Sequence, residues 1–167
     1  MEQTWILVGM MGSGKSSVGQ ALASLCEREF ADTDKLLSSL LGRPIPSLFQ
    51  VYGEEAFRAH ETSVLRKQEP GKKVLATGGG IVLREENWTE FQRLGVSTFV
   101  DVDLEFLLER LERGIWRRPL LQGDDWQAKV EQMLEYRRPF YERADKTIKI
   151  GGQPIELVAQ QIAELLQ

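Results

Sequence analysis

The segment GMMGSGKS, residues 9–16, constrains the fold more than any other part of the chain. It has the spacing G-x-x-x-x-G-K-S, follows the apolar run TWILVG and precedes an amphipathic helical pattern. A phosphate-binding loop requires this context, because the glycines turn backbone amides inward and the helix N-terminus adds a positive dipole. The plainer alternative is a glycine-rich turn with a solvated lysine, but a chance match to the full spacing is rare in a short chain. We therefore expect a P-loop that binds ATP or a similar nucleotide.

The residues of this loop have separate predicted roles. Lys15 is expected to reach the outer phosphates, and the Ser16 hydroxyl is expected to ligate Mg²⁺. The predicted ATP contacts in the loop are Gly12, Ser13, Gly14, Lys15, Ser16 and Ser17.

Short apolar runs alternate with amphipathic stretches along the rest of the chain. Strands are predicted over residues 4–9, 28–32, 73–77, 97–102 and 146–150, most of them apolar on both faces. Helices are predicted over residues 15–27, 53–68, 85–94, 104–113, 126–143 and 155–166. This alternation indicates an α/β fold with a doubly wound, five-stranded parallel sheet. The length of 167 residues fits a single domain, 1–167.

Two segments interrupt the alternation. Residues 34–70 are too long for one crossover and contain GRPIP, so we expect two or three short helices there, forming a substrate-binding lobe over about residues 33–61. Residues 114–125 are polar and broken by proline, which is typical of a mobile lid, here placed at about residues 113–125.

The composition argues against several classes of partner. With 21 basic and 25 acidic residues and a net charge of -4, the chain has no global positive field for nucleic acid or an anionic membrane. No apolar run approaches the ~20 residues of a membrane helix, and no basic leader precedes the first apolar run. The single cysteine, Cys26, falls on an apolar helical stripe and is expected in the core. We expect a cytoplasmic protein that binds neither nucleic acid nor membrane.

Two acids follow the second predicted strand, in FADTDK. Because side chains alternate along a strand, Asp32 and Asp34 are expected on one side, at the carboxyl edge where open α/β sheets bind ligands. One carboxylate would support Mg²⁺ through water, and the other would accept a proton from an acceptor hydroxyl. The alternative role is a helix N-cap at Asp34 or Thr33. The acid pair favours a kinase over a module that binds ATP without catalysis.

Two further segments indicate an acceptor site. In GEEAFRAHE, Arg58 and Glu61 stand three residues apart on a predicted helix, where they can pair, and Phe57 lies beside them. The fork of an arginine suits a carboxylate, although a surface ion pair is the more common role. In LATGGGIV, Gly78–Gly80 follow the third predicted strand, where missing side chains let a ligand approach the backbone.

In chain order, the segments GMMGSGKSSVG, DTD, GEEAFRAHE, TGGG, RRPLL and RRPFY resemble the shikimate kinase family over essentially the whole chain. Only the P-loop among them is widely shared with other kinases. The resemblance implies a fold of the nucleoside-monophosphate-kinase type and transfer of the ATP γ-phosphoryl group to the 3-hydroxyl of shikimate, with Mg²⁺, in aromatic amino-acid biosynthesis. We expect shikimate and ATP as partners and a monomer. Nothing in composition or spacing names that acceptor.

The resemblance also implies roles for particular residues. Asp34 would contact the acceptor hydroxyl as base, Arg58 and Arg137 would clamp the substrate carboxylate, and Asp32 would lie near the metal beside Ser16. The implied substrate contacts are Asp34, Phe49, Phe57, Arg58, Gly78, Gly79, Gly80 and Arg137.

Arginines near the predicted lid complete the implied ATP site. Arg118 resembles the family arginine that closes over the phosphates, and it joins Asp34 and Lys15 as a predicted catalytic residue. The neighbouring Arg117 and Trp116 depart from the family pattern, which leaves open which arginine points inward.

The sequence leaves two candidates for the arginine that contacts adenine. Spacing does not decide between Arg110 and Arg113 as the arginine that stacks on adenine; Arg110 is preferred, and a helical ion pair is an equal role for either. Pro154 matches a proline that lies near the adenine in relatives.

Other functions have less support. The single asparagine, Asn87, leaves no N-K-x-D motif for a GTPase, and a gluconate-type or nucleoside monophosphate kinase would need a different acceptor pocket. Asp101 resembles a Walker B acid, but Asp103 is better interpreted as a helix N-cap. His60 is expected to be solvated.

Overall fold

A computed structural model describes residues 2–114 and 121–167. Its five strands are parallel and form one sheet in the order β2-β3-β1-β4-β5, which confirms the predicted doubly wound sheet. β1 is central, so the loop that follows it lies where neighbouring connections leave in opposite directions, the usual ligand crevice of such sheets. The strands are β1 (Thr4–Val8), β2 (Glu29–Asp32), β3 (Lys73–Ala76), β4 (Gly95–Val102) and β5 (Lys146–Ile150).

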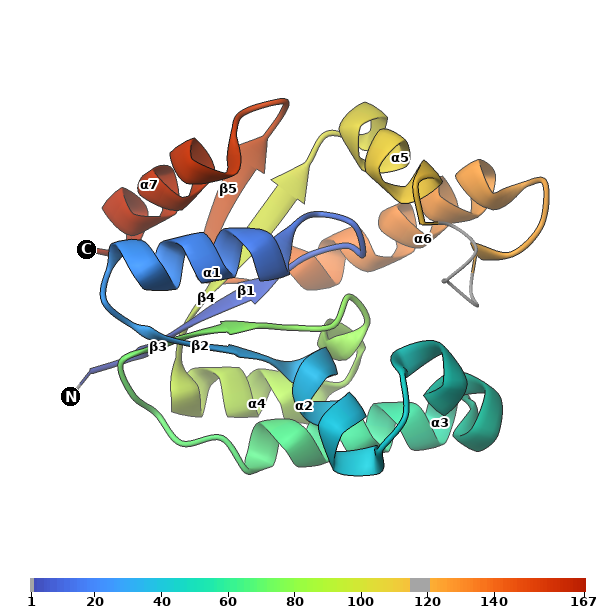
Figure 1. The fold of residues 1–167 in the computed structure, drawn as a ribbon, viewed down its shortest axis with the longest axis horizontal. Coiled ribbons are helices and arrows are strands. Elements are labelled where there is room, and N and C mark those ends of the chain that lie inside the picture. Colours follow the sequence, from blue (N-terminus) through green and yellow to red (C-terminus); the bar gives the residue numbers. More distant parts are fainter. Residues whose placement is uncertain (1, 115–120) are drawn as a thin grey trace.

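Helices cover both faces of the sheet. Helices α1 and α7 pack together on one face, and α4 lies on the opposite face (Figure 1). The helical elements are α1 (Lys15–Leu25), α2 (Thr33–Leu41), α3 (Ile45–Arg66), the short 3-10 helix η1 (Ile81–Leu83), α4 (Glu85–Leu94), α5 (Leu104–Glu112), α6 (Trp126–Tyr141) and α7 (Ile155–Leu166). In the part of the chain that is described, no helix combines the length and the apolar character needed to span a membrane.

The core explains why the strands are apolar on both faces. All five residues of β1 are buried, because helices cover the sheet from two sides. Most buried side chains of strands and helices belong to one large cluster. A second, smaller cluster of Leu37, Leu48, Phe57 and Val64 joins α2 to α3. The segment predicted as a substrate-binding lobe thus has a small core of its own.

Several local expectations need correction. α3 joins two helices at Gly53, whose φ of 76° and ψ of 171° are not helical, so the predicted helix over residues 53–68 is its second part and a further helix begins at Ile45. A glycine suits this position because a side chain strains a positive φ. Cys26 is the C-cap of α1 and only half-buried, packed against the core rather than within it. His60 is half-buried beside the Tyr52 ring, with ring centroids 5.6 Å apart, rather than fully solvated.

Candidate active site

The phosphate loop joins β1 to α1. Gly12 and Gly14 have positive φ values of 78° and 84°, a conformation that glycine adopts without strain. Gly14 is also the residue that precedes α1, so the loop amides and the N-terminus of the helix are next to each other. The buried ammonium of Lys15 donates to the carbonyls of Gly9 (2.7 Å) and Met10 (2.9 Å) and to Ser13 Oγ (3.2 Å).

Asp32 connects this loop to the lobe. It is the N-cap of α2: its Oδ1 accepts from the amides of Asp34 (2.9 Å) and Lys35 (3.4 Å). Its Oδ2 accepts from the Ser16 hydroxyl. A carboxylate is favoured at this position because it satisfies amides that a helix N-terminus leaves unbonded.

This geometry corrects the prediction for the two acids. The strand ends at Asp32 and Asp34 already belongs to α2, so strand alternation does not set their relative direction. The N-cap is Asp32, rather than Asp34 or Thr33. Asp32 faces Ser16 of the phosphate loop, whereas Asp34 lines a separate pocket.

The Ser16–Asp32 contact also tests whether a magnesium ion fits. A hydroxyl and a carboxylate in contact offer two oxygen ligands, and Mg²⁺ commonly takes only one or two protein ligands, with waters and phosphates completing the shell. The described residues contain no cluster of three or more His, Cys, Asp or Glu side chains arranged for a metal. The pair therefore suits Mg²⁺ bound together with a nucleotide, and no all-protein cage is needed. Asp101, the weaker metal candidate, is held by Arg138 through two hydrogen bonds of 3.1 and 3.2 Å.

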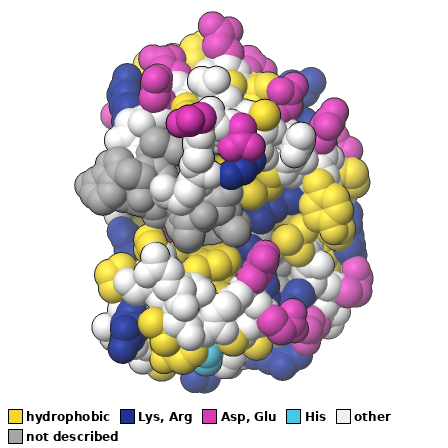
Figure 2. Space-filling model, turned by 90° about the vertical axis from the view of Figure 1, so that its right-hand side faces the viewer, with side chains coloured by type: hydrophobic (Ala, Val, Ile, Leu, Met, Phe, Trp, Pro, Cys, Tyr) yellow, Lys and Arg dark blue, Asp and Glu magenta, His cyan; other side chains and the backbone are white. Residues whose placement is uncertain are grey.

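A cavity of about 370 Å³ lies between the lobe and the glycine turn after β3. Apolar and basic side chains meet in a hollow on the face that carries the carboxyl ends of the strands (Figure 2). The predicted substrate contacts all line this cavity: Asp34, Phe49, Phe57, Arg58, Gly78, Gly79, Gly80 and Arg137. Met11, Ile45, Pro46, Glu61 and Gly114 line it as well and were not predicted as substrate contacts.

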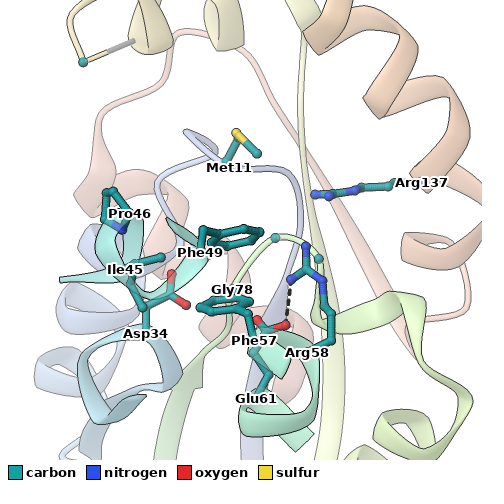
Figure 3. Close-up of a pocket in the computed structure, with 13 residues that line it drawn as sticks. Met11, Asp34, Ile45, Pro46, Phe49, Phe57, Arg58, Glu61, Gly78 and Arg137 are labelled. Carbon is teal, nitrogen blue, oxygen red and sulfur yellow. Dashed lines mark hydrogen bonds and ion pairs between the residues drawn. The ribbon is translucent and has the colours of Figure 1, made fainter. Parts of the chain in front are cut away.

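Arg58 occupies one wall of the cavity and is held by Glu61. The Arg58 Nη1 donates to Glu61 Oε1 at 2.6 Å, the pair marked in Figure 3. The guanidinium also lies over the rings of Phe49 and Phe57, 5.6 and 5.4 Å from their centroids. The expected pairing of Arg58 with Glu61 is confirmed, and it is a buried pair rather than a surface one.

Glu61 has an unusual environment for an acid. It is 2% exposed, and burial raises its pKa to about 7, against the opposing effect of Arg58. Its Oε2 has no hydrogen-bond partner among the described residues. The spacing to Arg58 pointed to a pair, but only the packing of α3 places that pair in the buried wall of the cavity.

Arg137 enters the cavity from α6, on the same side as Arg58 and opposite Asp34 (Figure 3). It is 3% exposed, and its Nη1 has no partner in the described part of the chain. Arg58 Nε is likewise buried and without a partner there. Buried guanidinium nitrogens without acceptors are costly unless a ligand supplies the oxygens.

The glycines of the turn leave room for these side chains. A Cβ on Gly80 would lie 2.3 Å from Arg58 Nη2, and one on Gly78 would lie 2.8 Å from Asp34 Oδ1 and 2.7 Å from Glu61 Oε2. Here the glycines are needed for close approach, because any side chain would displace the charged groups around the cavity.

A second cavity of about 190 Å³ adjoins the phosphate loop. Ser13, Gly14, Ser17 and Arg110 line it, together with the unpredicted Gln153, Ile155 and Val158. Arg110 Nη1 donates to the Ser13 carbonyl at 3.2 Å.

The two arginines considered for adenine differ clearly in position. Unlike Arg110, Arg113 has a side chain that is 80% exposed, and it pairs with Glu109 at 3.7 Å. Pro154 precedes α7 and is exposed, while its neighbours line the second cavity. Arg118, with Arg117 and Trp116, lies outside the described residues.

Comparisons with known proteins agree with this geometry. The family model for shikimate kinase matches residues 11–167. A shikimate kinase of Symbiobacterium thermophilum is 40% identical over 165 residues, covering 97% of this chain and 95% of the relative. One from a Synechococcus strain is 41% identical over 160 residues, covering 94% and 84%.

Solved structures of shikimate kinases also have a similar fold. A shikimate kinase from Acinetobacter baumannii in complex with shikimate has a TM-score of 0.93 at 36% identity, covering 99% of this chain and 93% of that one. The enzyme from Aquifex aeolicus has a TM-score of 0.80 at 33% identity, covering 98% and 95%. With the phosphate loop, the acid-lined cavity and the buried arginines all in place on this fold, the chain belongs to the shikimate kinase family.

Proposed function

We propose that this protein transfers the γ-phosphoryl group of ATP to the 3-hydroxyl of shikimate, giving shikimate 3-phosphate and ADP, in the route to aromatic amino acids. The observation that carries the proposal is the first cavity, where Asp34 and the buried Arg58 and Arg137 line one space of about 370 Å³. A small cyclic hydroxy-acid matches that set, because it brings a carboxylate for the guanidinium groups and hydroxyls for the acid.

The two arginines hold the substrate carboxylate. The nitrogens Arg58 Nε and Arg137 Nη1 are buried without partners in the described residues, so a bound carboxylate would supply the missing acceptors. Phe49 and Phe57 provide apolar walls for the ring, and Gly79 and Gly80 let it approach the backbone.

Asp34 acts on the acceptor hydroxyl. Its carboxylate accepts the hydroxyl proton as the oxygen attacks the γ-phosphorus and the bond to the β,γ-bridging oxygen breaks, releasing ADP. The position of Asp34 in the first turn of α2, against Gly78, supports this role because it places the acid on the cavity wall.

The phosphate loop holds the nucleotide. Lys15 exchanges its contacts with loop carbonyls for the outer phosphates, and Ser13, Gly14, Ser16 and Ser17 border the chain of phosphates. Arg110 lies beside the base or ribose in the second cavity, with Pro154 at its edge. Ser16 and Asp32 hold Mg²⁺, which neutralises phosphate charge when bound.

The segment at about residues 113–125 acts as a lid, and Arg118 closes over the γ-phosphate. Closure excludes water and protects ATP from hydrolysis. The lobe at about residues 33–61 forms the acceptor side of the cavity, which its separate small core supports. We also propose a cytoplasmic monomer that binds neither nucleic acid nor membrane, consistent with the net charge of -4.

The decisive experiment is an acceptor panel. ADP release is measured with ATP and Mg²⁺ in the presence of shikimate, gluconate or CMP, each alone. Release that depends on shikimate only, with shikimate 3-phosphate identified by mass spectrometry, is the expected result. Release with gluconate or CMP instead would assign the cavity to another acceptor, and nucleotide binding without any acceptor-dependent release would leave a non-catalytic module.

A further inference from the structure

The backbone of the glycine turn has an uneven pattern of hydrogen bonds. All of its carbonyls are bonded: Gly78 O accepts from Ile81 N (3.3 Å), Gly80 O from Leu83 N (3.1 Å) and Gly79 O from the Tyr141 hydroxyl (2.6 Å). The amide of Gly78 donates to Thr33 Oγ1 at 3.0 Å. The amides of Gly79 and Gly80, in contrast, find no acceptor among residues 2–114 and 121–167. Both belong to residues that line the acceptor cavity.

Tyr141 reaches the turn from behind the cavity. It is fully buried at the end of α6 and does not line the cavity, and its ring stacks on Phe99 with centroids 5.1 Å apart. Burial raises the pKa of Tyr141, opposed by the charge of Arg137, so the phenol keeps its proton and donates it to the Gly79 carbonyl. The hydroxyl also lies 3.7 Å from Met10 Sδ, next to the phosphate loop.

The hydrogen bond from Tyr141 to the Gly79 carbonyl also fixes the direction of the Gly80 amide. In a planar trans peptide the carbonyl of one residue and the amide of the next point opposite ways. Because the Gly79 carbonyl points toward Tyr141, on the side away from the cavity, the Gly80 amide points toward the cavity. A glycine peptide has little steric preference for either orientation, so a hydrogen bond is needed to select one.

Thr33 holds the other end of the turn. Its side chain is buried, between Asp32, which caps α2, and Asp34, which lines the cavity. The bond from Gly78 N to Thr33 Oγ1 ties the turn after β3 to the start of α2. Two buried hydroxyls therefore hold the glycine turn. Thr33 accepts from the amide of Gly78, and Tyr141 donates to the carbonyl of Gly79.

We infer that the hydroxyls of Tyr141 and Thr33 are positioning groups, which orient the Gly78–Gly80 backbone so that the unbonded Gly80 amide faces the acceptor. This inference rests on the proposed function, since it concerns how the same cavity holds shikimate. Neither hydroxyl touches the substrate. Their effect is on acceptor binding, because the nucleotide contacts lie in the phosphate loop.

Tyr141→Phe tests the first anchor, because it keeps the ring on Phe99 and removes only the hydroxyl. The shikimate KM is expected to rise about three- to tenfold, the equivalent of one net hydrogen bond, while the ATP KM stays within about twofold. Tyr136→Phe is the matched control, since Tyr136 stands on the same helix with 67% exposure. That control should leave both constants unchanged.

Thr33 provides an independent test with its own rescue. Thr33→Val preserves the shape of the side chain and removes the hydroxyl, so it should also raise the shikimate KM selectively, by about three- to tenfold. Thr33→Ser retains a hydroxyl and should restore most of the loss. A purely structural role for Thr33 would give no such difference between valine and serine at equal thermal stability.

The outcomes separate this inference from the proposed function. If wild-type protein shows no shikimate-dependent ADP release, the function itself is wrong. If wild-type protein is active but Tyr141→Phe and Thr33→Val both keep the shikimate KM within about twofold, the positioning role is wrong. Equal increases in the KM of ATP and of shikimate would also overturn it, because they would indicate general loosening of the fold.

Discussion

The phosphate loop and the acceptor cavity border the same short segment, residues 32–34, but they satisfy their polar groups in opposite ways. The ammonium of Lys15 is held by two loop carbonyls and a serine hydroxyl, and Ser16 donates to Asp32. In the cavity, by contrast, Arg58 Nε, Glu61 Oε2 and Arg137 Nη1 are buried without partners among the described residues.

This difference has energetic consequences. A buried polar atom left unpaired costs about 1–3 kcal/mol, so a ligand that bonds to such atoms recovers that cost on binding. Under the proposed function, the nucleotide would instead exchange existing contacts of Lys15 for new ones, and its net gain per contact would be smaller. Removal of a cavity side chain should therefore affect the acceptor strongly and selectively, whereas the nucleotide side should respond more weakly.

The largest effect is expected from Asp34→Asn. Loss of the base should lower kcat about 100- to 10,000-fold in the shikimate assay, because an amide accepts no proton from the hydroxyl. Circular dichroism and thermal melting should remain close to wild type. A kcat within about threefold of wild type would remove Asp34 from the base role and leave it a binding residue only.

Arg58→Ala tests the cavity side of the comparison directly. The shikimate KM should rise about 10- to 100-fold, since a charge-assisted contact to the carboxylate is lost, with little change in the ATP KM. Arg66→Ala is a suitable control, because Arg66 stands on the same helix with a side chain 57% exposed and pairs with Glu86. Comparable increases for both substrates would argue against a carboxylate clamp.

Arg110→Ala tests the nucleotide side of the comparison. The ATP KM should rise about three- to tenfold, because Arg110 lines the second cavity beside the phosphate loop. Arg113→Ala should change it less than twofold, since that side chain is 80% exposed and points to Glu109. The reverse ranking would show that Arg113, rather than Arg110, contacts the nucleotide.

The last expected effect concerns stability rather than turnover, as a pH dependence that comes from Glu61. Its folded pKa of about 7 lies above the ordinary glutamate value of 4.5, so between these values the folded state binds the proton more tightly than the unfolded state. The contribution of Glu61 to the free energy of unfolding therefore falls as pH rises from about 4.5 to 7. Glu61→Gln removes this titration, and its stability relative to wild type should improve by about 2–3 kcal/mol between pH 5 and pH 8. Urea melts at both pH values measure the difference, and a constant offset would refute it.

Sequence patterns predicted the strands well because their signal is local. β1, β3 and most of β4 are buried runs within the sheet, and the P-loop spacing located the turn between β1 and α1. The direction of Asp34 was not predictable in the same way. The chain leaves the strand at Asp32 to begin a helix, and that change depends on a cap contact that no alternation rule contains.

The site residues show the same limit. Arg58 and Glu61 were found by helical spacing, but the burial that raises the pKa of Glu61 arises from packing of α3 against the glycine turn. Arg110 and Arg113 are three residues apart on the chain and were indistinguishable until α5 was placed beside the phosphate loop. Tyr141 ends the segment RRPFY, but nothing local indicated its role, because its partner Gly79 lies 62 residues away in the chain.

The two oxygens of the Asp32 carboxylate connect the phosphate loop to the helix that carries Asp34. One oxygen accepts from the serine of the phosphate loop, and the other secures the first turn of the helix that carries Asp34. A ligand that drew this group toward the phosphate loop would change the hold on that first turn, and binding at one side would then alter affinity at the other. Thermodynamic reciprocity then requires that each substrate shift the dissociation constant of its companion by the same factor.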